Sequence, residues 1–243
     1  MKNHSFLLLL CLALMLASSG CSKTTGNKEE PATSENKEQP ASLKIAFGSC
    51  GNPQRPLPIF DQVVEHQPDL FIFLGDNIYG DTDDMKILKR KYQNLADQPS
   101  FQNLKKHTEI LATWDDHDYG RNDAGNEYPH KEASKQVFLE FFEEPKESSR
   151  YQHQGIYHSV TRQVGEKIVQ IILLDGRSFR DSIPRNPQRG KDKHSFYPLD
   201  YLPTKDTSKS MLGEEQWYGS NKNLSSRQTA ASSQAAHNSA SNT

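Results

Sequence analysis

The feature that most restricts the fold of this chain is a series of short apolar segments, each of which runs directly into polar residues. Apolar, β-branched and aromatic side chains dominate these segments, as is typical of buried strands. Between them, apolar residues recur at helical spacing. Strands are predicted within residues 43–49, 69–76, 109–118 and 155–177 (two strands around a turn at 164–167), and helices at 57–67, 82–97 and 131–143. The alternation predicts an α/β or α+β layered domain.

The residues that follow the strands carry metal-binding and acid–base groups. In chain order they are Ser49-Cys50, Gly75-Asp76, Asp115-Asp116-His117-Asp118 and Asp175-Gly176-Arg177. Ligands of layered α/β folds bind beyond the carboxyl ends of the strands. If the strands are neighbours and run the same way, several carboxylates converge there and repel one another unless a cation neutralises them. The pattern therefore predicts a site with more than one metal ion.

Each of these strand ends also has an ordinary explanation. An aspartate after a strand is usually a turn residue, and an acidic cluster is usually a solvated surface. A lone cysteine is most often a small buried apolar residue. Their repetition at four strand ends in order favours a site over coincidence.

The two ends of the chain have compositions that do not predict a fold. Residues 1–20 predict a secretory signal peptide, because an apolar run too short to span a bilayer follows Lys2 and small residues follow the run. Cys21 after Ser-Ser-Gly resembles the lipidated cysteine of bacterial lipoproteins, and Ser22 resembles those sorted to the outer membrane. The alternative is an ordinary cleaved signal with a soluble product. The composition predicts a lipidated cysteine and a disordered tether within residues 21–42. It predicts a folded domain at 43–219 and a disordered tail at 220–243.

Charge and cysteine content narrow the possible functions. The chain has 29 basic and 31 acidic residues, which argues against a general nucleic-acid-binding surface. Cys11 leaves with the predicted signal and Cys21 would carry lipid, so Cys50 has no disulfide partner within the chain. In an oxidising compartment such a thiol is buried, paired with another chain, or bound to metal.

Five segments together resemble the alkaline phosphatase D family, which belongs to the calcineurin-like and purple-acid-phosphatase-like metallophosphoesterases. The resemblance covers about residues 43–217. The segments are "FGSC" (47–50), "FLGDNIYGD" (73–81), "TWDDHDYGRND" (113–123), "LLDGRSFRD" (173–181) and "MLGEEQW" (211–217). The resemblance implies a β-sandwich flanked by helices and hydrolysis of phosphate esters, either monoesters or diesters, at a dinuclear metal site.

The resemblance also implies the metal ligands. Asp76 would bridge two ions, Tyr79 would be a phenolate ligand, and Cys50 would supply a thiolate where an aspartate is more usual. Asp116 would bind the second ion. A thiolate and a phenolate favour iron or zinc, and an all-oxygen half-site suits calcium, so iron plus calcium is expected, with zinc or manganese as alternatives.

The remaining implied roles concern the substrate. His117 would contact the phosphate or protonate the leaving group, with Asp115 or Asp118 orienting its ring. Arg177 and Arg180 would neutralise the phosphate. The alternative for these arginines is structural pairing with the neighbouring aspartates, Asp175 and Asp181.

The chain departs from the family pattern after Trp217. The family completes its site with a later segment that supplies histidines, whereas this chain changes at residues 218–220 to polar residues of low complexity. The domain is therefore expected to lack its carboxyl-terminal part through truncation or a frameshift. The alternative is a shortened form that uses other histidines: His107, His130, His153, His158 or His194. The competing functions are a non-catalytic metal- or phosphate-binding surface lipoprotein and a structural surface lipoprotein.

Overall fold

The computed structural model describes residues 42–187 and 201–219. The predicted signal peptide, Cys21, all but the last residue of the predicted tether, His194 and the predicted tail lie outside these residues. Within the described ranges, no helix combines the length and the apolar character needed to cross a membrane.

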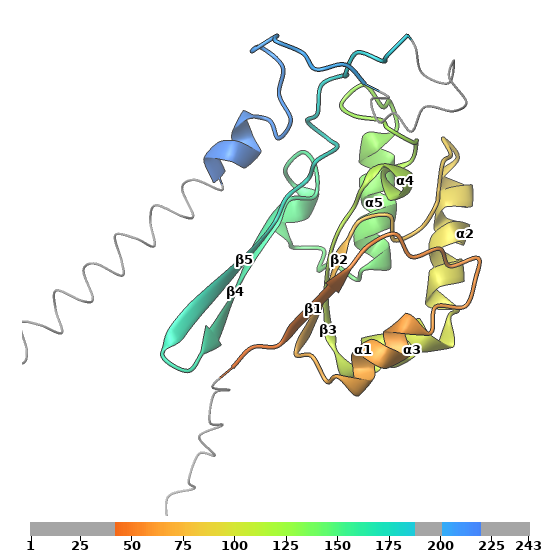
Figure 1. Ribbon diagram of the computed structural model, residues 1–243, viewed down its shortest axis with the longest axis vertical. Coiled ribbons are helices and arrows are strands. Elements are labelled where there is room, and N and C mark those ends of the chain that lie inside the picture. The colour runs from red at the N-terminus through yellow and green to blue at the C-terminus, as the bar shows by residue number, and fades with distance from the viewer. Residues whose placement is uncertain (1–41, 188–200, 220–243) are drawn as a thin grey trace, which may run out of the picture. The chain divides into compact units, whose positions relative to one another are not determined.

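Three parallel strands form the sheet that positions the site (Figure 1). They are β1 (Ile45–Gly48), β2 (Leu70–Leu74) and β3 (Glu109–Thr113), in the order β1-β2-β3. Both pairs are parallel, and Gly48 of β1 pairs with Phe73 of β2, which pairs with Ala112 of β3. The condition stated for the strand ends, that the strands are neighbours and run the same way, holds for these three strands, so their carboxyl ends meet at one edge of the sheet.

Helices connect and cover the strands. They are α1 (Ile59–Glu65), α2 (Met85–Ala96), α3 (Pro99–His107), α4 (Asp116–Tyr119), α5 (Lys131–Phe141) and the 3-10 turn η1 (Ser149–Tyr151). Three of them match the predicted helices, with shorter ends. Helix α3 is not predicted from the sequence because it is short and begins only three residues after α2 ends. Pro99 at its first position suits a helix start, and Phe101 and Leu104 anchor it in the core.

The central strand β2 is buried on both faces, which explains its nearly continuous apolar run. Phe71 and Phe73 point into the main core, where aromatic rings of α1, of α3 and of the residue that ends α5 pack around them. Leu70 and Ile72 point the other way and pack with Leu173. Alternate side chains of a strand face opposite sides, so the two clusters follow from the pleat of the strand.

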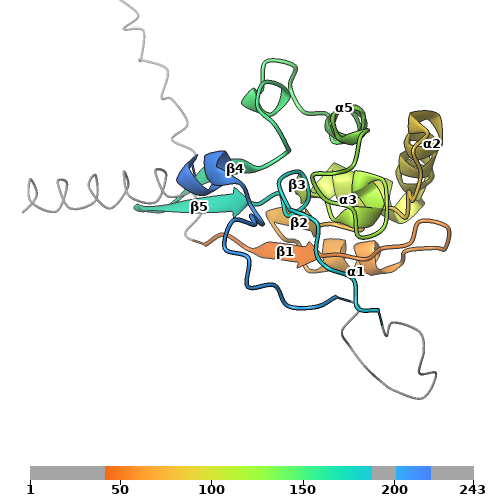
Figure 2. The same ribbon diagram turned by 90° about the horizontal axis from the view of Figure 1, so that it is seen from above.

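Leu173 belongs to a hairpin that forms the second layer (Figure 2). Strand β4 (His158–Val164) pairs antiparallel with β5 (Lys167–Leu173), as the turn at 164–167 predicts. The α/β class is confirmed. The second layer of the described residues is this two-stranded sheet, so the fourth strand end reaches the site from a different sheet rather than from the parallel one.

Asp175 fixes the end of β5 against β3. It is fully buried and accepts hydrogen bonds from Trp114 Nε1 (2.9 Å), from the backbone N–H of Ile156 (2.9 Å) and from the backbone N–H and hydroxyl of Ser178 (2.9 and 2.7 Å). Thr113 Oγ1 also donates to Leu174 O at 2.7 Å. The two sheets are therefore joined at the edge where the strands of the parallel sheet end.

Gln216 attaches the last described segment to the same point. Its Oε1 accepts a hydrogen bond from the Asp175 backbone N–H (2.6 Å), and its Nε2 donates to the carbonyls of Asp175 (3.0 Å) and Leu212 (2.8 Å). Gln216 is fully buried although its neighbours in the helical turn over residues 214–219 are largely exposed. The "LGEEQW" segment is thus held by its glutamine.

Replacing Gln216 with alanine is expected to destabilise the protein by about 1–3 kcal/mol, because the substitution leaves the buried N–H and C=O of Asp175 without partners. Urea unfolding of the two proteins measures the difference. Glu214→Ala, an exposed change in the same helical turn, is the control and should lie within about 0.5 kcal/mol of the parent. Equal losses for both variants would contradict this account of Gln216.

Candidate metal centre

The carboxylate of Asp76 is placed by an unusual backbone at the end of β2. Gly75 has a φ of 109° and Asp76 a φ of 50°. A Cβ on Gly75 would lie 2.6 Å from Asp115, so glycine allows the chain after β2 to approach the chain after β3. A left-handed conformation at a residue other than glycine is strained, and such strain concentrates at functional sites.

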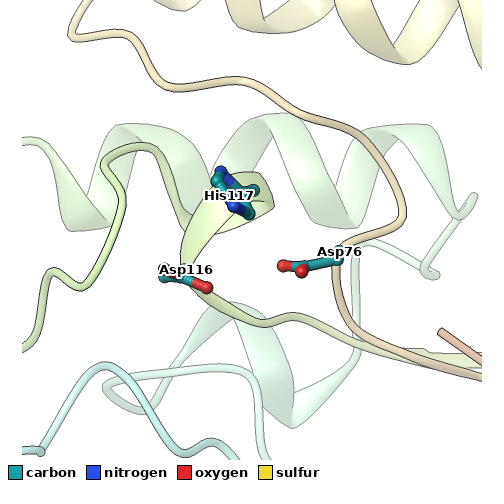
Figure 3. Close-up of side chains that lie close together, drawn as sticks. All are labelled: Asp76, Asp116 and His117. Atoms are coloured by element: carbon teal, nitrogen blue, oxygen red, sulfur yellow. The ribbon is translucent and has the colours of Figure 1, made fainter. Parts of the chain in front are cut away.

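Among residues 42–187 and 201–219, one group of three metal-ligating side chains lies close enough together to hold an ion: Asp76, Asp116 and His117. One ligand atom of each lies within 4.8 Å of the others. Figure 3 shows the carboxylate of Asp76, on the loop after β2, and that of Asp116 pointing toward one another, with His117 beside them. Asp116 and His117 both belong to the short helix α4. The predicted convergence of two strand ends therefore takes place.

The surroundings of Asp76 fit a bound cation. Burial raises the pKa of Asp76, and the nearby charges of Asp116 and Asp115 raise it further, whereas His117 opposes them. Asp76 Oδ1 is buried and has no hydrogen-bond partner among the described residues. A buried carboxylate oxygen without a partner is costly, and a positive ion would remove that cost.

Cys50 and Tyr79 lie at the edge of this group, as the resemblance implies. Cys50 Sγ is 3.6 Å from Asp76 Oδ2, and the Cys50 backbone has a left-handed φ of 60°. The Tyr79 ring centroid is 4.5 Å from that of His117. Burial raises the pKa of Tyr79, and the negative charge of Asp76 raises it further. A bound cation would oppose this shift and favour the phenolate.

Asp81 is the partner of His117, although neither motif reasoning nor spacing identified it. Both carboxylate oxygens lie close to His117 Nδ1, at 2.7 and 2.8 Å. Burial alone would lower the pKa of His117, but the hydrogen bond and charge of Asp81, with the charges of Asp116 and Asp76, raise it above its ordinary value. The signal was present in the sequence, as the second aspartate of "FLGDNIYGD".

Asp118 has a structural position instead of the orienting one that we considered for it. It is fully buried, and it accepts hydrogen bonds from the backbone N–H of Asn77 (3.0 Å), from Asn77 Nδ2 (2.6 Å) and from the backbone N–H of Asp115 (2.6 Å). Burial raises the pKa of Asp118 well above its ordinary value. Asp118 thus joins the loop after β2 to the start of α4 and so holds Asp76 near Asp116.

Arg177 pairs with the carboxylates of the site. Its guanidinium contacts the Asp115 carboxylate, and its Nη2 lies 3.5 Å from Asp116 Oδ1. Asp115, the other residue considered for orienting His117, thus faces the arginine. The backbone N–H of Arg177 donates to Asp175, while Arg180 donates to the carbonyl of Asp123. Arg177 therefore faces the carboxylates of the candidate metal centre, and Arg180 supports a neighbouring loop.

The alternative histidines that fall within the described ranges do not join the group. The Nδ1 of His107 lies 2.9 Å from Asn103 O, and the Nδ1 of His153 lies 2.9 Å from Gln154 O. His130 precedes α5 and packs on Tyr128, and His158 lies in β4. Each of these four side chains has its place elsewhere in the fold.

Replacing Asp81 with asparagine is expected to lower the pKa of His117 in the metal-free protein. The parent should titrate above the ordinary histidine value near 6.5, and the variant below the parent, because the substitution removes the negative charge that stabilises the imidazolium. An NMR titration of the His117 ring measures both. Asp83→Asn is the control, since Asp83 pairs with Arg121 instead. An unchanged pKa in Asp81→Asn would contradict this assignment.

Comparison with known proteins decides the family. The sequence profile of the PhoD-like phosphatases matches residues 45–231. The chain belongs to the PhoD-like phosphatase family. The resemblance to the alkaline phosphatase D family is therefore confirmed, and the match ends beyond residue 219, in a part outside the described residues.

Two further comparisons complete this result. A solved structure titled "Structure of PhoD" is similar at a TM-score of 0.48 and 19% sequence identity. The similarity covers 73% of this chain and 38% of that one, so the matching part spans well under half of the length of the solved chain. A search of curated proteins finds no match.

Proposed function

We propose that this chain hydrolyses phosphate esters, monoesters or diesters, at a dinuclear metal site formed by the loops after β1, β2 and β3. The observation that carries the proposal is the group of Asp76, Asp116 and His117, in which a buried oxygen of Asp76 lacks a partner among the described residues. Membership of a phosphatase family supports the reaction class.

The donor atoms suggest how the residues would share the ions. Cys50, Asp76 and Tyr79 would hold one ion, for which the sulfur and phenol donors favour iron or zinc. Asp76 and Asp116 would hold the other, for which oxygen donors suit calcium or manganese. When bound, such a metal pair supplies Lewis-acid polarisation of the phosphoryl group and a nucleophile at neutral pH.

The other residues would bind the substrate and move a proton. The carboxylates around His117, Asp81 above all, favour its protonated form, so His117 could donate a proton to the leaving oxygen. Asp81 would hold Nδ1 of the ring and leave Nε2 for the substrate. Arg177 would contribute positive charge to the phosphate, because a guanidinium matches its geometry.

The test is hydrolysis of bis(p-nitrophenyl) phosphate by the full chain, supplied with iron plus calcium, with zinc, or with manganese. We expect turnover that depends on added metal and stops when a chelator is added. Absence of turnover from a folded, metal-loaded protein would contradict the proposal, and would favour a non-catalytic metal- or phosphate-binding protein.

We also propose that the protein is exported and held to the outer membrane by lipid on Cys21. The support is the apolar run before "SSGC" and the polar segment after it. Radiolabelled palmitate should enter the parent in bacterial cells and not enter Cys21→Ala. Equal labelling of the two would overturn this part of the proposal.

A further inference from the structure

An apolar cavity of about 220 Å³ lies between β1, β2 and α1. We call it the β1–α1 cavity. Its walls include Leu57, Phe60, Val63, Phe71 and Phe73. These side chains offer no charge and no hydrogen-bonding group, so the cavity suits an apolar group.

The mouth of the β1–α1 cavity is also apolar. Ile59 is 60% exposed and lines the cavity. Gly48 lines it as well, and for a Cβ placed on Gly48 the nearest atom outside its chain neighbours is Phe71 Cζ at 3.5 Å. Because residue 48 is a glycine, the cavity keeps space that a larger side chain at this position would fill.

The β1–α1 cavity adjoins the candidate metal centre. Ser49 and Gly51 line it, and Cys50 lies between them in the chain. Asn77 lines it too, directly after Asp76. Consecutive Cα atoms are about 3.8 Å apart. If a phosphoryl group is held beside Cys50 and Asp76, the group on its ester oxygen can therefore reach the cavity.

We propose that the β1–α1 cavity binds the apolar part of the substrate, an aromatic ring or a short alkyl chain on the ester oxygen. This inference rests on the proposed function and adds a substrate class to it. A cavity of about 150 Å³ lined by apolar side chains is known to take up benzene, so the size of this one suits a single ring. Burial of the ring removes apolar surface from water, which favours such esters over those of small polar alcohols.

The test compares the binding of two phosphonates that are not hydrolysed, phenylphosphonate and methylphosphonate. Calorimetry with the full chain supplied with iron and calcium gives both affinities without any turnover. We expect phenylphosphonate to bind about tenfold to 100-fold more tightly, because its ring would be buried in the cavity. Equal affinities would overturn the inference.

Two variants connect this preference to the cavity. Gly48→Val places a side chain in the cavity at a strand position, where valine is favoured, and should remove most of the phenyl preference. Thr161→Val adds a valine to an exposed position of β4, outside the cavity, and should keep the preference. Persistence of the preference in Gly48→Val would overturn the inference, since the ring would then bind elsewhere.

A third variant covers the case in which Gly48→Val does not fold. Leu57→Ala removes part of the wall and should shift the preference from phenylphosphonate toward the larger naphthylphosphonate. An unchanged ratio of the two affinities would contradict binding in the cavity.

Hydrolysis of bis(p-nitrophenyl) phosphate is measured in parallel. A phenyl preference that depends on the cavity, without turnover, would support binding in the cavity and contradict the proposed hydrolysis. Turnover with equal affinities for the two phosphonates would support the hydrolysis and contradict binding in the cavity.

Discussion

Replacing Asp76 with asparagine is expected to abolish the metal-dependent hydrolysis of bis(p-nitrophenyl) phosphate while the protein still folds. Loss of a residue that only supports a metal ligand costs about 10–100-fold, so loss of the shared ligand itself should cost more than about 100-fold. The backbone at position 76 has a φ of 50°, and asparagine tolerates this conformation as aspartate does. The rate with iron plus calcium and the far-ultraviolet circular dichroism of both proteins measure the effect.

The matched control is Asp84→Asn. Asp84 is exposed on the loop that follows the Asp76 segment, where its side chain accepts a hydrogen bond from Lys86 N at 2.8 Å and begins α2. Asparagine serves equally well at a helix start, so the control should keep both fold and rate. If Asp76→Asn kept the parent rate, the carboxylate would have no part in the reaction and the proposed site would be wrong.

Asp175→Ala is expected to give the largest loss of stability, about 3–5 kcal/mol of unfolding free energy. The buried carboxylate receives hydrogen bonds from the Trp114 ring, from the Ser178 hydroxyl, and from backbone N–H groups that include those of Ile156 and Arg177. Alanine leaves all of these donors buried without a partner, and it releases the end of β5 from β3. Urea unfolding monitored by the fluorescence of the buried Trp114 measures the change.

Asp206→Ala is the control for this loss. Asp206 is exposed, and its side chain accepts hydrogen bonds from the nearby Ser208. Its replacement should cost less than about 1 kcal/mol. Similar losses for the two variants would mean that the network around Asp175 does not hold the two sheets together.

The sequence was sufficient to predict the strands and the place of the site at their ends, because both depend on local patterns. The apolar run of β2 indicates a strand buried on both faces, and the aspartate at its end stands where parallel strands present their ligands. Asp116 and His117 follow β3 in the same way. The structure brings these three residues together as expected.

The partners of these residues could not be predicted from spacing along the chain. Asp81 reaches His117 across a separation of 36 residues, and Asp118 turns away from the neighbouring histidine to bind Asn77. Which of several aspartates meets the imidazole depends on how two loops pack, and a sequence pattern does not contain that information. The position of β5 in a second sheet is unpredictable for the same reason.

The most direct test of the central claim is the metal content of the purified full chain after loading with iron and calcium. Inductively coupled plasma mass spectrometry of the parent and of Asp76→Asn, after removal of free metal, gives the number of ions per chain. We predict two bound ions in the parent and a marked loss of both in the variant, since Asp76 would hold the two ions together. A parent without bound metal, or a variant with the same content as the parent, would contradict the account.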